Sequence, residues 1–317
     1  MKRALRFTCC ACIVFLLTRT GTAWAHGFAG QRFFPATLVV DDPFVADELS
    51  LPTVSYFKNP ASGDSPATGE TDISVEFSKV IFPNFGLSLH ETWIHLQPDG
   101  QASQTGFGNL EVGGKYQFFT NGPHETILSV GLAAEIGGTG RKAVGADSFT
   151  TFTPALFYGK GLGDLPESLA LLRPLAITGQ LGVTFPTQAQ SVTGTGDQAT
   201  INQHPNVLQW GFVVEYSIPY LQSFVKDVGL PAPFNRMFPV VELSFQTPLN
   251  RGQGGQTTGT VNPGILWAGQ YIQLGVEAMI PINNRTGAHV GVIGQLHFYL
   301  DDLFPKLFGR PLFGGGS

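Results

Sequence analysis

The chain has 317 residues, a formal net charge of −5 and only 13% charged residues, about half the share of an average soluble protein. It also carries 40 glycines and 26 phenylalanines. This composition excludes a coiled coil, a helical repeat and a charged disordered chain, and the acidic balance argues against a nucleic-acid partner. The mean hydropathy of +0.10 is high, yet no apolar run reaches the ~18 residues of a membrane-spanning helix.

The first 25 residues have the three parts of a secretory signal peptide. A basic stretch over 1–6 precedes an apolar stretch over 7–17, and residues 23–25 form an A-x-A cleavage site. Cleavage there removes all three cysteines, which excludes a disulfide framework and a thiolate site in the mature chain. It also removes four of the 18 cationic residues and none of the 23 acidic ones, so the formal net charge becomes −9.

Alternation of apolar and polar residues dominates the rest of the chain and predicts strands. The expected ranges are 51–58, 71–80, 86–96, 107–119, 125–137, 149–160, 174–186, 206–219, 237–248, 259–268, 270–282 and 287–300. Most are close in length to the ~9–11 residues with which a strand crosses a membrane. They are longer than the roughly 5–6 residues usual in soluble sheets.

The connections between these strands favour a membrane barrel over a soluble sandwich. Long polar loops such as 138–148 and 187–205 alternate with tight turns such as 83–84, which is the layout of outer-membrane barrels. Alternation alone does not decide, because a sandwich turns its apolar face inward and a membrane barrel turns it outward. We predict an all-β fold, an antiparallel transmembrane β-barrel of about 12 strands.

This fold divides the chain into four parts. We expect a signal peptide over 1–25, a periplasmic or plug segment over 26–50, the barrel over 51–300 and a tail over 301–317. The plug assignment depends on the apolar Phe28, Phe33, Phe34 and Phe44, which need cover. The expected location is the outer membrane of a Gram-negative-type bacterium, reached through the cleaved signal peptide.

Charged residues on the polar strand faces are the candidates for lining a lumen. They are Glu76, Glu111, Lys115, Glu135, Glu215, Glu242, Glu277 and His297. In a conducting lumen, this acidic surplus disfavours anions and passes cations or neutral solutes. In the alternative, the carboxylates are protonated or paired and fill a barrel too narrow to conduct. The sequence leaves both interpretations open.

The sequence offers no catalytic, metal or cofactor site, and we expect no enzyme. His90, Glu91 and His95 do not have the H-E-x-x-H spacing, and they lie on a predicted strand instead of a helix. Ser88 and His90 share a strand face, but nothing in the sequence supplies an orienting group for a nucleophile. An outer-membrane hydrolase is therefore the weaker alternative.

Two segments resemble strands of a known family of signal-bearing outer-membrane barrels. Residues 106–116 read Gly-Phe-Gly-Asn-Leu-Glu-Val-Gly-Gly-Lys-Tyr, and residues 178–186 read Thr-Gly-Gln-Leu-Gly-Val-Thr-Phe-Pro. The first matches the pattern G-x-G-D/N-x-x-[LV]-G-x-K-Y of the family labelled MetA-pathway of phenol degradation. The resemblance spans roughly residues 50–300. It implies a transporter-like channel linked with uptake of aromatic or other hydrophobic compounds.

We therefore expect a channel that passes small solutes, including hydrophobic or aromatic ones, by passive diffusion. A non-conducting barrel with a structural or surface-interaction role is the alternative. The expected partners are outer-membrane lipid, small-molecule solutes and the barrel-assembly machinery. The chain departs from many barrels at its end, because residues 301–317 follow the last predicted strand where those barrels finish on an aromatic residue.

Overall fold

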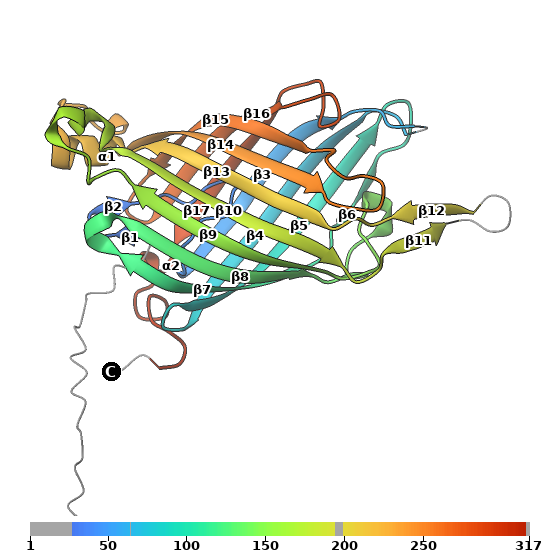
Figure 1. Ribbon diagram of the computed structural model, residues 1–317, viewed down its shortest axis with the longest axis horizontal. Coiled ribbons are helices and arrows are strands. Elements are labelled where there is room, and N and C mark those ends of the chain that lie inside the picture. Colours follow the sequence, from blue (N-terminus) through green and yellow to red (C-terminus); the bar gives the residue numbers. More distant parts are fainter. Residues whose placement is uncertain (1–26, 64, 194–198, 315–317) are drawn as a thin grey trace, which may run out of the picture.

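The computed structural model describes residues 27–63, 65–193 and 199–314, so the predicted signal peptide lies outside the described residues. Twelve long strands form the body of the molecule (Figure 1). They are β3 Glu48–Asn59, β4 Thr68–Phe82, β5 Phe85–Pro98, β7 Glu111–Asn121, β8 Thr126–Glu135, β9 Thr151–Gly161, β10 Leu175–Pro186, β13 Val207–Tyr216, β14 Met237–Pro248, β15 Thr258–Ala268, β16 Ile272–Pro281 and β17 Gly291–Tyr299. Five short strands accompany them: β1 Phe28–Ala29, β2 Arg32–Phe33, β6 Gln104–Phe107, β11 Gln190–Thr193 and β12 Thr200–Gln203.

The twelve long strands close into an antiparallel barrel. Each pairs with the next along the chain, and β17 pairs with β3 to complete the ring. The prediction of a twelve-stranded antiparallel barrel is confirmed. The predicted strand 107–119 is divided in the structure. β7 pairs with residues 85–90 of β5 and belongs to the barrel ring, whereas β6 precedes it in the chain and pairs with residues 93–96 of β5.

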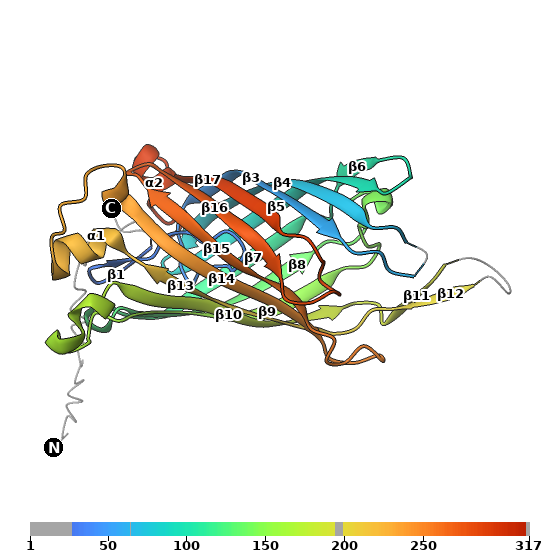
Figure 2. The same ribbon diagram turned by 90° about the horizontal axis from the view of Figure 1, so that it is seen from above.

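The two ends of the barrel differ, as Figure 2 shows. One end, called here the turn end, holds both ends of the described chain and the short helices η1 Gly122–His124, η3 Glu167–Leu172, α1 Ile218–Tyr220, η5 Leu221–Val225, η6 Phe234–Arg236 and α2 Leu300–Leu303. The opposite loop end holds η2 Lys142–Val144, β6 and the β11–β12 hairpin. No helix within the described residues is long and apolar enough to cross a membrane.

The outward face of the barrel is apolar. Large apolar side chains along the strands are exposed, among them Tyr56, Ile73, Leu87, Leu132, Leu156, Leu181, Leu274, Val276 and Val292. Neighbours of these residues on the opposite strand face, such as Gln273 and Glu277 beside Leu274 and Val276, are buried. Successive side chains of a strand point to opposite faces. The apolar face predicted from the sequence therefore points outward, as in a barrel surrounded by lipid.

The N-terminal segment, defined here as residues 27–47, packs inside the barrel near the turn end and buries apolar side chains there. Phe34 and Phe44 of this segment form one buried cluster with Ile127 and Ala176 of the barrel wall. A second buried cluster joins Val40 to inward-facing Val213, Phe238, Val240 and Leu266. Burial of such side chains stabilises the packing by about 1.5–3 kcal/mol each.

Two strand glycines make this packing possible. A Cβ atom on Gly275 of β16 would lie 2.6 Å from Leu38 Cδ1, and one on Gly211 of β13 would lie 3.0 Å from Val40 Cγ2. A larger residue at Gly275 would force the Leu38 side chain to move, and one at Gly211 would also meet Leu243 O of the neighbouring strand at 2.5 Å. These glycines therefore mark close approach of a second chain segment, which is one of the usual reasons for glycine within a strand.

The C-terminal tail, residues 304–314, runs from the end of β17 past the start of β3 to β4, next to the seam where β17 and β3 close the ring. Strand β3 pairs with β4 only as far as Ser78, which leaves the last residues of β4 without a neighbour on that side. The tail occupies this edge: Leu312 N donates to Val80 O at 3.1 Å, and Phe313 N donates to Ile81 O at 2.8 Å. An exposed strand edge is a template for unwanted pairing, so the tail protects the seam.

Asp47 fastens the same seam. It is buried at 1% exposure, and its carboxylate accepts hydrogen bonds from Val80 N (2.6 Å), Lys79 Nζ (2.8 Å) and Gly309 N (2.7 Å). Its carbonyl oxygen accepts from Leu300 N at 3.0 Å. One side chain thus joins the N-terminal segment, β4 and the tail.

Candidate functional site

The candidate site is the interior of the barrel, and its shape depends on how the N-terminal segment is held. Glu242 of β14 is fully buried, and its carboxylate accepts hydrogen bonds from three successive backbone N–H groups, of Leu38 (2.7 Å), Val39 (3.0 Å) and Val40 (2.7 Å). Successive N–H groups that converge in this way form an anion-binding concavity. Charge-assisted bonds of this kind are about twice as strong as neutral ones.

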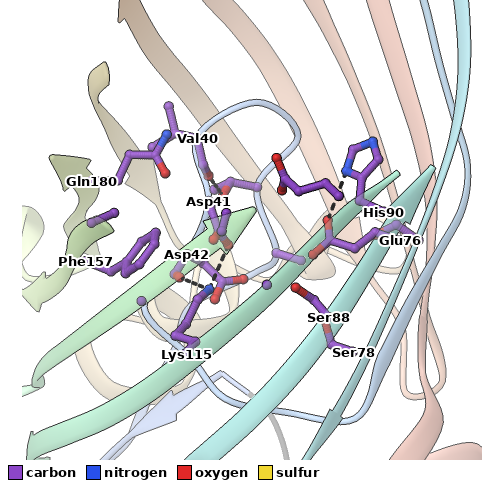
Figure 3. Close-up of a pocket in the computed structure, with 18 of the residues that line it drawn as sticks. Val40, Asp41, Asp42, Glu76, Ser78, Ser88, His90, Lys115, Phe157 and Gln180 are labelled. Carbon is purple, nitrogen blue, oxygen red and sulfur yellow. Dashed lines mark hydrogen bonds and ion pairs between the residues drawn. The ribbon is translucent and has the colours of Figure 1, made fainter. Parts of the chain in front are cut away.

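Lys115 of β7 holds the segment from the opposite wall. Its ammonium donates to the Asp41 carboxylate at 2.8 Å and to the Asp42 carbonyl oxygen at 2.7 Å, and it lies 4.6 Å from the centre of the Phe157 ring (Figure 3). Carboxylate, carbonyl and aromatic face together satisfy the half-buried ammonium. Lys115 is therefore bound by the segment and is not free to attract a solute.

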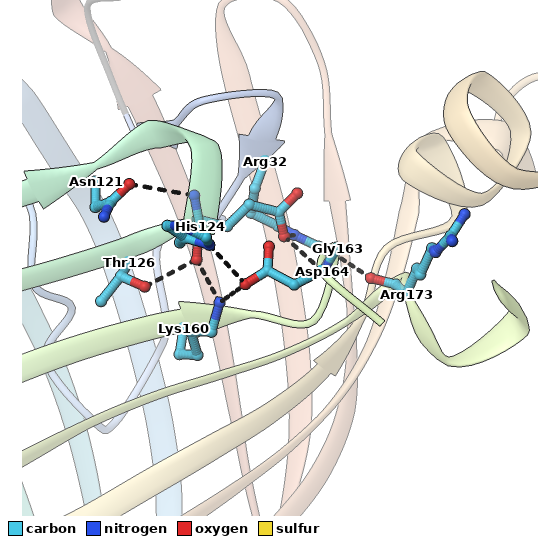
Figure 4. A network of polar contacts seen from close by, with 9 residues as sticks. Arg32, Asn121, His124, Thr126, Lys160, Gly163, Asp164 and Arg173 are labelled. Carbon is cyan, nitrogen blue, oxygen red and sulfur yellow. Dashed lines mark hydrogen bonds and ion pairs between the residues drawn. The ribbon is translucent and has the colours of Figure 1, made fainter. Parts of the chain in front are cut away.

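Arg32 anchors the segment at the turn end. It is fully buried, and its guanidinium pairs with Glu125 at 3.0 Å, donates to Pro174 O at 2.7 Å and donates to Arg173 O. The same group lies 3.9 Å from the centre of the Tyr220 ring. These partners come from three different turns of the barrel, so one side chain ties the segment to all of them. Figure 4 shows Arg32 with its hydrogen bond to Arg173.

Packing and hydrogen bonds around Arg32 shift the pKa values of two nearby groups, Tyr220 and Asp164. Burial and the hydrogen bond with Glu125 raise the pKa of Tyr220 to about 12, so its ring stays neutral against Arg32. Nearby, Asp164 accepts from Lys160 Nζ at 2.9 Å and contacts His124 Nδ1 at 3.1 Å (Figure 4). The hydrogen bond from Lys160 lowers the pKa of the exposed Asp164 carboxyl.

A cavity of about 570 Å³ remains between the N-terminal segment and the wall formed by β3, β4, β5, β7, β8, β9, β10, β13, β14 and β17. Its lining is mostly polar and includes five carboxylates, those of Asp41, Asp42, Glu48, Glu76 and Glu111. Among the described residues that line it, Lys115 is the only lysine or arginine. Glutamine side chains from four strands complete the lining: Gln180, Gln209, Gln246 and Gln295.

The structure divides the eight residues predicted from the sequence into three groups. Glu76, Glu111, Lys115 and His297 line the cavity. Glu215, Glu242 and Glu277 are at most 2% exposed and lie on β13, β14 and β16, where the N-terminal segment covers the wall. Glu135 stands apart near the loop end, where it accepts a hydrogen bond from Asn109 Nδ2 at 3.0 Å. The predicted carboxylates therefore do not form one continuous acidic surface.

Sequence reasoning missed the contributions of Asp41, Asp42 and Glu48 to the cavity. Glu48 and Ser50 alternate with Leu49, a signal that β3 begins before residue 51. Asp41 and Asp42 belong to an irregular segment, so periodicity gives no signal for them. Ser50 Oγ lies 2.9 Å from His297 Nδ1, with Glu48 Oε2 3.7 Å from His297 Nε2, and this grouping ties β3 to β17 at the seam.

Irregular strand geometry helps to bring Ser50 and Glu48 of β3 next to His297 of β17. The pairing of β3 with β4 shifts register between Ser50 and Thr53, and that of β17 with β3 shifts between Gln295 and His297. Bulges of this kind re-aim side chains. No arrangement of three or more His, Cys, Asp or Glu side chains within the described part of the chain is suited to holding a metal ion.

With its closed ring, apolar exterior and polar interior, the molecule is a twelve-stranded β-barrel of the outer-membrane type. Among solved structures, it is similar to the COG4313 outer membrane channel from Pseudomonas putida F1, with a TM-score of 0.56, 10% identity, and coverage of 84% of this chain and 99% of that chain. Identity at this level shows the fold alone.

Two further structures are more distant. The KdgM porin matches with a TM-score of 0.45 and 12% identity over 79% of this chain and 98% of that chain. LpxR from Salmonella typhimurium matches with a TM-score of 0.41 and 10% identity over 80% of this chain and 99% of that chain. No protein-family model and no curated protein matches the chain. The resemblance to the phenol-degradation family therefore stays a prediction.

Proposed function

We propose that this barrel is a channel of the outer membrane that passes small polar solutes and prefers cations and neutral solutes to anions. The observation that carries the proposal is the cavity in which five carboxylates face one lysine that is already paired. Rings of acidic side chains select cations in other channels. The polar lining supports polar solutes more directly than the aromatic compounds that the family resemblance implies.

The proposal includes an orientation and a route to the membrane. The turn end faces the periplasm and the loop end faces outward, as in barrels with short periplasmic turns and long external loops. The chain reaches the outer membrane through the signal peptide and the barrel-assembly machinery, with lipid around the apolar exterior. The N-terminal segment acts as a plug at the periplasmic mouth.

Replacing a cavity glutamate by lysine tests the charge preference. In planar bilayers, we expect the native channel to favour K⁺ over Cl⁻, and we expect Glu76→Lys or Glu111→Lys to reduce or reverse this ratio, because both carboxylates line the cavity. Glu167→Lys is the matched control, since that side chain lies outside the barrel at the turn end and is 87% exposed. An unchanged ratio in both cavity variants would contradict the acidic lumen.

The attachment of the plug should depend on pH. Burial raises the pKa of Asp42 from 3.8 to about 6, so the docked segment holds a proton that the undocked segment releases within this range. Docking is therefore favoured below the range and is weakened as the pH rises through about 6. Hydrogen exchange of residues 36–46, corrected for intrinsic rates, should show stronger protection at pH 5 than at pH 7.5.

The control for this pH effect is Asp42→Asn, which removes the titrating group but keeps the size of the side chain. The difference in protection between the two pH values should shrink in this variant. Equal protection at both pH values in the native chain would show that Asp42 does not control docking.

A non-conducting barrel is the second candidate, and one observation favours it. The N-terminal segment packs against Val213, Phe238 and Leu266 of the inner wall, so it obstructs the turn end of the lumen. In this case the segment is a permanent part of the core, and bilayers containing the native protein carry no current. The deletion described in the Discussion separates the two candidates.

A further inference from the structure

The turn end carries a lobe outside the barrel wall, formed by residues 162–174 with η3 and residues 217–236 with α1, η5 and η6. The two parts touch where η3 packs against η5, and Tyr216 Oη donates to Leu171 O at 3.1 Å. Figures 1 and 2 both show η3 and α1 beyond the strand ends, next to β10 and β13. The lobe is much larger than the tight turns at residues 83–84 and 269–271 of the same barrel end.

The lobe exposes several large apolar side chains. Six large apolar side chains are between 44% and 61% exposed: Leu169, Leu171, Leu172, Phe224, Val228 and Phe234. Large exposed apolar patches mark contact surfaces for membrane or protein, and these six side chains all belong to the two packed parts of the lobe. In water each would cost roughly 25 cal/mol for every Å² of apolar area left exposed.

The position of the lobe indicates lipid as the occupant. It connects β9 to β10 and β13 to β14, whose outward side chains Ile177, Leu181 and Val241 belong to the exposed apolar surface of the barrel. The apolar side chains of the lobe are therefore attached directly to strands whose outward surface lipid is expected to cover. Tyr216 lies at the junction, where aromatic residues commonly mark the membrane–water boundary.

The charges of the lobe also fit a lipid headgroup region. Lys226 and Arg236 are exposed on it. Two of its acidic groups have local contacts, since Glu167 pairs with Arg173 at 3.0 Å and Asp227 accepts from Gly229 N at 2.8 Å, although both side chains are exposed. Apolar side chains combined with exposed cations are typical of segments that lie in the interface of membranes with anionic lipids.

We infer that this lobe is a second membrane-contact surface, which lies in the headgroup region of the leaflet at the turn end. The inference rests on the proposed placement of the barrel in a membrane. It adds an anchor below β9, β10, β13 and β14.

Spin labels measure this contact directly, because the mature chain expected after cleavage contains no cysteine. Single variants Leu171→Cys, Phe224→Cys and Phe234→Cys would be labelled and studied in bilayers of phosphatidylethanolamine and phosphatidylglycerol. Leu132→Cys, on the outward face of β8, serves as the lipid control, and Ser103→Cys, exposed at the loop end, serves as the water control. All five positions are exposed, so the substitutions should not disturb folding.

The expected result is that the three lobe labels are more accessible to dissolved oxygen than to a polar nickel complex, as the Leu132 label is. Lobe labels that behave like the Ser103 label would overturn the inference. So would lobe labels that neither reagent reaches, because they would show a protein contact. If the Leu132 label also behaves as if it were in water, the proposed membrane barrel itself fails, and the two failures are thereby distinguished.

Discussion

Deletion of residues 27–45 is expected to raise single-channel conductance several-fold. In the native barrel these residues contact Glu242 on one wall and Lys115 on the other, and they bury inward-facing Val213 and Leu266. Their removal leaves an interior open from the turn end to the loop end. The deletion spares Asp47, so the hydrogen bonds from Val80 and Gly309 that fasten the seam remain. The measurement is the current through single channels in planar bilayers.

The matched control keeps the segment but weakens one of its attachments. Glu242→Gln removes the negative charge that three backbone N–H groups share, and it should give a smaller rise in conductance or brief openings. If the deleted form conducts exactly as the native form does, the segment is not a plug. If neither form carries current, the channel proposal fails and the non-conducting barrel replaces it.

Replacement of Arg32 by alanine is expected to weaken docking of the N-terminal segment by roughly 3–5 kcal/mol, the usual effect of breaking a buried ion pair by removing one partner. The variant loses the pair with Glu125, two hydrogen bonds to carbonyl oxygens and the contact with the Tyr220 ring. Native-state proteolysis reports the population of the undocked segment. Cleavage within residues 27–46 should therefore become faster by a factor on the order of 10² to 10⁴.

Two comparison variants show whether this effect belongs to the buried pair. Lys58→Ala breaks the exposed pair with Asp99 and should change stability by only about 0–1 kcal/mol. The double variant Arg32→Ala with Glu125→Gln should be cleaved more slowly than Arg32→Ala alone, because it removes the buried charge that has lost its partner. Cleavage at the native rate in Arg32→Ala would show that the anchor is dispensable.

The barrel could be predicted from the sequence because its main signal is local. Alternation of Leu274 and Val276 with Gln273 and Glu277 fixes both the strand and its two faces. The same logic fails where both faces of a strand are apolar. β14 begins Met-Phe-Pro-Val-Val, and nothing in this run tells that Phe238 and Val240 point inward, against a segment that precedes them by about 200 residues.

The candidate site could be predicted only in part, for a related reason. Glu76 and Glu111 lie on the polar faces of regular strands, so the alternation of apolar and polar residues was enough to predict that both side chains point into the barrel. The pairing of Glu242 with Leu38 spans 204 residues, and no local pattern records such a contact. The sequence placed Glu242 among lumen carboxylates, whereas the structure uses it to bind backbone N–H groups. Its role depends on a partner that only the folded chain supplies.

The contact of the tail with β4 has a consequence for the order in which the barrel is built. β3 and β17 are the first and last strands of the ring, so their pairing closes the longest loop of chain and carries the largest entropic cost. Gly309, Leu312 and Phe313 reach Asp47 and β4 from beyond β17. The final hydrogen bonds of the seam therefore need residues that lie beyond the last strand of the ring. Closure of the ring and docking of residues 309–313 are thus coupled steps in the assembly of this barrel.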